Sequence, residues 1–124
     1  MTSLGVRAVV RPNPTSTLAP FVGGDRFPSD DENYIRDVVY HASVQCNSTL
    51  LSLNSHKFQP QGVTCVAMLA ESHISIHTWP EKGMAVCDVF TCGEHTEPQK
   101  SVDYMKMVLH ATDIVCNEFV RPLE

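Results

Sequence analysis

The sequence has few basic residues and no long apolar run. Nine Lys and Arg stand against 14 Asp and Glu, which gives the 124-residue chain a formal net charge of −5. Scattered positive charge does not form the basic face that nucleic acids require, so we expect no nucleic-acid partner. No apolar stretch approaches the roughly 20 residues of a membrane helix, and residues 1–10 lack the apolar centre of a signal peptide. We therefore expect a cytoplasmic protein with no membrane partner.

The cysteines lack the spacing of a disulfide framework or a zinc site. They form an odd set with no C-x-x-C pair: Cys46, Cys65, Cys87, Cys92 and Cys116. This pattern argues against a secreted, disulfide-rich fold and predicts reduced thiols. We interpret Cys87 as an ordinary core residue, because a buried free cysteine behaves as a small hydrophobe.

The length allows one domain with a modest core and leaves little room for two. Helical spacing of apolar residues predicts helices from about 30 to 46 and from 99 to 112. Alternating and β-branched patterns predict strands at 4–10, 49–58, 63–69, 73–77, 84–91 and 113–120. Together they predict an α+β two-layer sandwich, an antiparallel sheet with both helices on one face. We expect a second subunit to cover the other face.

Proline is concentrated in one segment. Residues 12–28 contain half of the eight prolines and a Gly-Gly pair. Proline lacks the backbone N–H that helices and sheet interiors use, so this segment predicts a long loop.

Reactive side chains gather between residues 69 and 93. Polar residues alternate with isoleucine over 73–77, which predicts a strand with one polar and one core face. At a rise of about 3.3 Å per residue, His73 and His77 lie roughly 13 Å apart, so one metal ion cannot bind both and we expect no metal site. The same rise separates Ser72 from His77 by roughly 17 Å. A site that uses both residues therefore needs a second protomer.

One motif in this region is long and specific. Residues 70–81 read Ala-Glu-Ser-His-Ile-Ser-Ile-His-Thr-Trp-Pro-Glu, with His-Lys-Phe at 56–58 before them and Asp-Val-Phe-Thr-Cys-Gly at 88–93 after them. This pattern resembles the prokaryotic S-adenosylmethionine decarboxylases, which are pyruvoyl enzymes made from a self-cleaving proenzyme. The resemblance is dense over 49–93 and poor before residue 49.

The resemblance implies that the proenzyme cleaves itself between Glu71 and Ser72. The Ser72 hydroxyl attacks the preceding carbonyl carbon, and elimination and hydrolysis of the resulting ester leave a pyruvoyl cofactor derived from Ser72. The products are a β chain of residues 1–71 and an α chain of residues 72–124. The substrate amine then forms a Schiff base with the pyruvoyl ketone, which serves as the electron sink for loss of CO2.

The same resemblance assigns roles to neighbouring residues. His77 is the base for processing, and Thr64 stands where the family has a serine that assists it. Threonine keeps the hydroxyl, so cleavage is still expected. Cys92 corresponds to the residue that protonates the substrate α-carbon, which suits a thiol near neutral pH. His73 receives no definite role.

Substrate binding maps by resemblance to Phe58, Trp79 and Glu81. The two aromatic rings suit adenine and a sulfonium cation, and the carboxylate can accept hydrogen bonds from ribose hydroxyls. Without the resemblance, the aromatic residues would be interpreted as core or interface anchors and Glu81 as a solvated turn residue.

The strand distance and the resemblance together imply a homodimer with composite active sites. Ser72 and Cys92 would come from one subunit, and Thr64, His77 and Glu81 from its partner. Such dimers could pair further.

The resemblance thus implies a carboxy-lyase that makes decarboxylated S-adenosylmethionine for spermidine synthesis. Two alternatives stay open. The same pyruvoyl chemistry could act on L-arginine or L-ornithine, which need no adenine stack, so Phe58→Ala would spare that activity. An unprocessed homologue could instead be a regulatory or binding subunit.

Overall fold

The computed structural model describes residues 2–12, 29–70, 72–92, 96–109 and 111–122. Most of the loop predicted at 12–28 lies outside these ranges. The elements in chain order are β1 (Thr2–Pro12), α1 (Glu32–Gln45), β2 (Leu50–Lys57), β3 (Val63–Leu69), β4 (Ser72–Trp79), the 3-10 turn η1 (Pro80–Lys82), β5 (Met84–Cys92), α2 (Pro98–Val108) and β6 (Ala111–Pro122).

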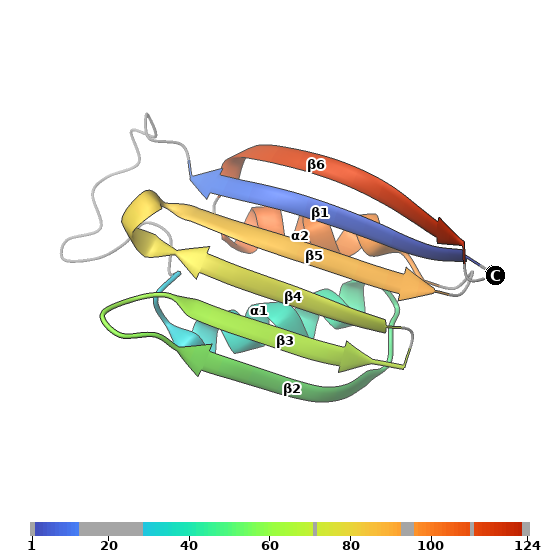
Figure 1. The fold of residues 1–124 in the computed structure, drawn as a ribbon, viewed down its shortest axis with the longest axis horizontal. Coiled ribbons are helices and arrows are strands. Elements are labelled where there is room, and N and C mark those ends of the chain that lie inside the picture. The colour runs from blue at the N-terminus through green and yellow to red at the C-terminus, as the bar shows by residue number, and fades with distance from the viewer. Residues whose placement is uncertain (1, 13–28, 71, 93–95, 110, 123–124) are drawn as a thin grey trace.

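The strands form one six-stranded sheet in the order β2-β3-β4-β5-β1-β6. Every neighbouring pair is antiparallel. Both helices pack against the same face, α1 over β2, β3 and β4, and α2 over β1, β5 and β6 (Figure 1). The predicted α+β two-layer sandwich is therefore confirmed. Within the described ranges, neither helix is long and apolar enough to cross a membrane.

The core lies between the helices and the sheet. Ile74 and Ile76 of β4 are fully buried, as their alternation with polar residues predicted. The apolar stripes of the helices meet them from the other layer, and their buried members are Ile35, Val38, Val39, Ala42, Cys46, Val102, Met105 and Leu109. Helix α1 begins where predicted, because the Asp31 side chain caps it by accepting a 3.1 Å hydrogen bond from the Tyr34 N–H.

The predicted end of the second helix is wrong. Apolar spacing suggested that the helix continues to residue 112, whereas α2 ends at Val108 and β6 begins at Ala111. Ala111 pairs with Pro12 of β1, so the chain is already part of the sheet at this residue. Tertiary pairing has overridden local helical periodicity, which is a weak determinant on its own.

The face of the sheet opposite the helices carries both polar and large apolar side chains. Met68 and Val66 of β3 are 57% and 38% exposed, respectively. They pair with His73 and Ser75 of β4, which alternate with the buried isoleucines and so lie on this helix-free face. The predicted covering of this face by a second subunit stays a prediction.

Two methionines of α2 test the helix–sheet core. Met105 is fully buried and Met107 is 67% exposed. Met105→Ala should lower the free energy of unfolding by about 2–5 kcal/mol, because it leaves a cavity, whereas Met107→Ala should change it by less than about 0.5 kcal/mol. Urea unfolding measures both values. Equal losses in the two variants would contradict the packing of α2.

Candidate active site

The predicted site residues lie at opposite ends of β4. Ser72 begins the strand and His77 lies near its end. The pairing with β3 runs without a bulge from Leu69–Ser72 to Thr64–His77, so the chain between them is extended. Five residues of extended chain span roughly 17 Å. A single chain therefore does not bring the Ser72 hydroxyl to the His77 ring.

Ser72 follows a tight hairpin. Because Leu69 pairs with Ser72, only residues 70 and 71 connect β3 to β4. Glu71 itself lies outside the described residues. Ser72 has a φ of +155° and is one of two described non-glycine residues with positive φ. Side chains disfavour this region, and such backbone strain often accompanies functional sites.

His73, to which the family resemblance assigns no definite role, is the neighbour of Ser72. Its Nδ1 atom lies 3.2 Å from Ser72 Oγ, within hydrogen-bond distance. Its ring packs against Phe90 of β5, with 5.3 Å between ring centroids. The signal in the sequence was only the adjacency of the two residues, because a contact of this kind depends on the backbone conformation at Ser72.

Cys92 ends β5 at the same end of the sheet as Ser72. Phe90 pairs with His73, so the backbone of Cys92 extends past the start of β4, where it pairs with Ser3 of β1. Its side chain lies outside the described part of the chain. The backbone positions agree with the predicted grouping of Ser72 and Cys92.

Two buried cysteines are unsuited to proton transfer. Burial raises the pKa of Cys87 to about 12 and that of Cys65 to about 11. At neutral pH neither supplies a thiolate. The prediction that Cys87 is an ordinary core residue is confirmed.

Three further predicted site residues, Thr64, Trp79 and Glu81, lie near His77 at the far end of β4. Thr64 Oγ1 and His77 Nδ1 face each other across β3 and β4 at 3.0 Å. Trp79 packs beyond His77, with 6.3 Å between ring centroids. Glu81 follows at once in η1 and is exposed. The structure thus places the residues assigned to the partner subunit at one end.

Phe58 completes this group from the end of β2. It is 45% exposed, so of the alternative interpretations a core residue is excluded, whereas an interface anchor is not. The ring of His56 meets it edge-on at 4.5 Å between centroids. His56 also pairs with Thr64, which pairs with His77, so these three residues form one row across the sheet. No local pattern in the sequence marks His56 as a site residue, since only the strand register places it there.

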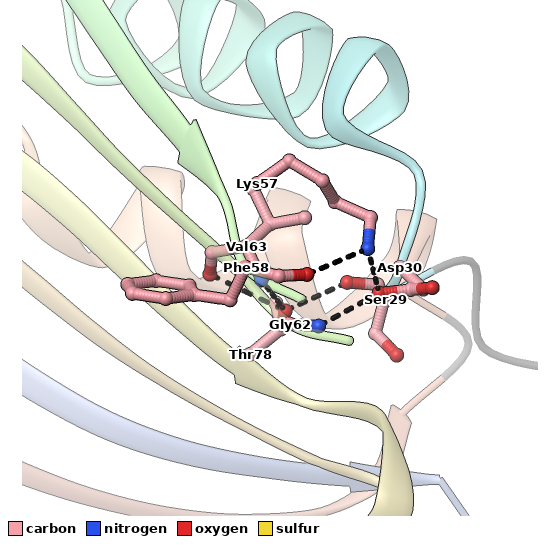
Figure 2. Close-up of polar contacts among 7 residues, drawn as sticks. All are labelled: Ser29, Asp30, Lys57, Phe58, Gly62, Val63 and Thr78. Carbon is pink, nitrogen blue, oxygen red and sulfur yellow. Dashed lines mark hydrogen bonds and ion pairs between the residues drawn. The ribbon is translucent and has the colours of Figure 1, made fainter. Parts of the chain in front are cut away.

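A polar network fixes the loop that carries Phe58 (Figure 2). Asp30 Oδ1 accepts hydrogen bonds from the Gly62 N–H at 2.7 Å and from Lys57 Nζ at 2.9 Å. Lys57 Nζ also donates to the Phe58 carbonyl at 3.1 Å. The Phe58 N–H donates to the Gly62 carbonyl at 2.8 Å. Both backbone polar groups of Phe58 are therefore held.

Thr78 joins the network to β4. Its Oγ1 donates to the Ser29 carbonyl at 2.6 Å and accepts from the Val63 N–H at 2.9 Å (Figure 2). Gly62 has a φ of +108°, and a Cβ there would lie 3.2 Å from the Thr78 carbonyl oxygen. Glycine is needed at this position because both the conformation and the close approach disfavour a side chain. The network ties the segment before α1 to both strands beside Phe58.

The Asp30 carboxylate gives this network a pH dependence. The Gly62 N–H, followed by Lys57, lowers the pKa of Asp30 in the folded protein. A lowered pKa contributes stability above the unfolded value of about 4, and this contribution is lost as the pH falls.

Asp30→Asn should therefore lower the free energy of unfolding by about 1 kcal/mol at pH 7 and by less near pH 3. Urea unfolding at both pH values measures the difference. Asp37→Asn, at an exposed position of α1, is the matched control and should show little effect. A loss in Asp30→Asn that is the same at pH 7 and pH 3 would contradict the role of the carboxylate.

Comparisons with known proteins agree on one family. A family model described as S-adenosylmethionine decarboxylase matches residues 16–122. The chain is 48% identical over 97 residues to the S-adenosylmethionine decarboxylase proenzyme of Synechococcus sp. (strain WH7803), covering 78% of this chain and 76% of that protein. It is 48% identical over 87 residues to the proenzyme of the same name from Methanococcus vannielii, covering 70% and 71%.

A solved structure is similar over almost the whole chain. The crystal structure of the adenosylmethionine decarboxylase from Aquifex aeolicus superimposes with a TM-score of 0.81 and 34% sequence identity. The match covers 98% of this chain and 92% of that one. It includes the N-terminal region, where the sequence motif gave little information.

Proposed function

The chain belongs to the S-adenosylmethionine decarboxylase family, and from this we propose how its own residues carry out the reaction. It is a carboxy-lyase that removes the carboxylate of S-adenosylmethionine as CO2. The names of its relatives support this substrate and give no support to L-arginine or L-ornithine. The word proenzyme in those names supports self-cleavage, which we place between Glu71 and Ser72.

The observation that carries the processing proposal is the setting of Ser72. Its hydroxyl lies 3.2 Å from a ring nitrogen, directly after a hairpin and at a backbone φ of +155°. A reactive hydroxyl beside a proton acceptor on a strained backbone fits the nucleophile of an acyl shift. When formed from Ser72, a pyruvoyl group supplies an electrophilic carbonyl that binds the substrate amine and accepts the electrons released with CO2.

The remaining roles follow the two ends of the sheet. At the Ser72 end, we assign Cys92 as the proton donor to the substrate α-carbon. At the other end, His77 acts as the processing base, and Thr64, 3.0 Å from its ring, assists it. The strand register alone supports the placement of Cys92 near Ser72. A direct contact supports the placement of Thr64 beside His77.

The same end supplies the residues that bind the nucleoside. Phe58 presents an exposed ring on a loop that hydrogen bonds hold in place, and such a ring can stack on adenine. Trp79 offers a second aromatic surface, and the exposed Glu81 can accept hydrogen bonds from ribose hydroxyls.

Separation of the two ends supports a homodimer with composite active sites. Ser72 and His77 lie roughly 17 Å apart along one strand, so both can serve one site only if they come from different subunits. The helix-free face between them exposes the apolar side chains of Met68 and Val66. Covering them with a second copy of the chain would remove apolar surface from water and so stabilise the dimer. Ser72 and Cys92 of one subunit would then meet His77 and its neighbours of the other.

Denaturing intact-mass measurement of the purified full chain tests the processing step. We expect a fragment of residues 1–71 and a chain from residue 72 that is lighter by one ammonia than a serine-started peptide. Ser72→Ala should give one full-length species. A wild-type protein that stays uncut on long incubation would contradict the proposed function.

Phe58→Ala tests the nucleoside site. Loss of a stacking ring should raise KM for S-adenosylmethionine by about 5- to 150-fold, because base–aromatic stacking contributes about 1–3 kcal/mol. Self-cleavage should continue, since Phe58 is assigned to substrate binding and has no proposed role in processing. Leu51→Ala, which removes an exposed apolar side chain of the strand that precedes Phe58, is the matched control. An unchanged KM in Phe58→Ala would show that adenine does not stack there.

A further inference from the structure

We propose that His73 is the base that accepts the proton of the Ser72 hydroxyl in the first step of self-cleavage. This inference rests on the proposed processing at Glu71–Ser72 and names a second catalytic histidine for it. The role is separate from that of His77, which acts on a later step.

The contact that carries the proposal joins reacting atoms directly. Ser72 Oγ lies 3.2 Å from His73 Nδ1, within the reach required between a nucleophile and its base. Both side chains are half-buried, so solvent competes only in part for the hydroxyl proton. Neutral imidazole with its proton on Nε2 leaves Nδ1 free to accept that proton.

Packing on the helix-free face holds the His73 ring in place. Phe90 lies 5.3 Å from it between ring centroids, with an angle of 32° between the ring planes. Phe90 in turn lies over Gly5 of β1, where a Cβ would overlap with its ring. Gly5 of β1 pairs with Phe90 of β5, and Phe90 pairs with His73 of β4, so the three residues form one row across the sheet. The absence of a side chain at Gly5 thus leaves room for the Phe90 ring, which packs against the proposed base.

Processing requires two separate protons to leave Ser72, one from Oγ and later one from Cα. His77 of the same chain lies roughly 17 Å away along the extended strand and contacts Thr64. It therefore cannot take the hydroxyl proton within its own chain. His73 is in position for that proton before any second subunit contributes, which leaves the α-proton to His77.

The step balances within the chain itself. The hydroxyl proton moves to His73 Nδ1 while Ser72 Oγ bonds to the carbonyl carbon of Glu71. When the bond from that carbon to the Ser72 nitrogen breaks, the same proton passes from His73 to the leaving amine. The product is an ester with the composition of the original peptide, so no water, oxidant or reductant is consumed.

Hydroxylamine distinguishes the two histidines, because it cleaves an ester and leaves an ordinary peptide bond intact. In the full-length chain, His73→Asn should lower the rate of self-cleavage by about 10²- to 10⁴-fold, the usual contribution of a general base. The uncut His73→Asn protein should resist hydroxylamine. His77→Ala should stop later, and hydroxylamine should release residues 1–71 from it. Denaturing mass spectrometry reads both results.

The choice of asparagine separates proton transfer from positioning. Its amide oxygen can accept the Ser72 hydrogen bond near the place of Nδ1 but cannot take up the proton at neutral pH. Added imidazole should restore part of the cleavage in His73→Ala. Removal of the exposed His41 of α1 as His41→Ala is the matched control and should leave the rate unchanged.

Several outcomes would overturn the proposal. Self-cleavage of the His73→Asn protein at the wild-type rate would overturn it. Cleavage of the uncut His73→Asn protein by hydroxylamine would also overturn it, because that result would show that the ester still forms. If thermal unfolding shows that His73→Asn does not fold, Phe90→Leu replaces it as the test, because it removes the aromatic ring that holds the histidine. Phe90→Leu should slow cleavage, and its uncut protein should resist hydroxylamine. An unchanged rate in Phe90→Leu would overturn the proposal. If Ser72→Ala still yields two fragments, the proposed function itself fails, whereas normal cleavage in the His73 variants alone leaves that function standing.

Discussion

The extended, unbroken pairing of β4 with β3 is the constraint on which the rest of the site depends. It fixes Ser72 at one end and His77 at the other, with Leu69 and Thr64 as their respective partners. The rise of a strand cannot be compressed without loss of its hydrogen bonds, so the distance between these residues is a property of the fold. Any chemistry that needs both ends must therefore recruit a second copy.

This constraint divides the proposed work between two histidines. His73 contacts Ser72, the proposed nucleophile and its neighbour in the chain, whereas His77 contacts Thr64 near the other end of β4. An intramolecular acyl shift needs only groups that are already close to the peptide, so it can use the local residue. Elimination and substrate binding can use groups from another subunit. In the proposed mechanism, a second subunit would supply His77 and the substrate-binding residues to the site that contains Ser72.

Hydrogen bonds to backbone groups hold Phe58 in place at the end of the sheet where we propose that the nucleoside binds. The carbonyl and N–H of Phe58 and the N–H of Gly62 are all held by specific partners, and one of these is the Asp30 carboxylate from the segment before α1. Such a network gives an exposed aromatic ring a fixed direction without burying it. Preorganisation of this kind reduces the conformational entropy lost when a ligand binds.

The local features of this protein could be predicted from its amino-acid sequence alone. The alternation over 73–77 identified a strand and its buried face, the apolar stripes identified both helices, and the motif around Ser72 identified the family, because each signal lies within a few neighbouring residues. Tertiary structure decided the end of α2, the row of His56, Thr64 and His77, and the network at Asp30. These features depend on which strands pair and in which register, and pairing partners far apart in the chain leave no local pattern. The contact of His73 with Ser72 lies between the two cases: its residues are adjacent in sequence, but only the backbone conformation at Ser72 turns their side chains together.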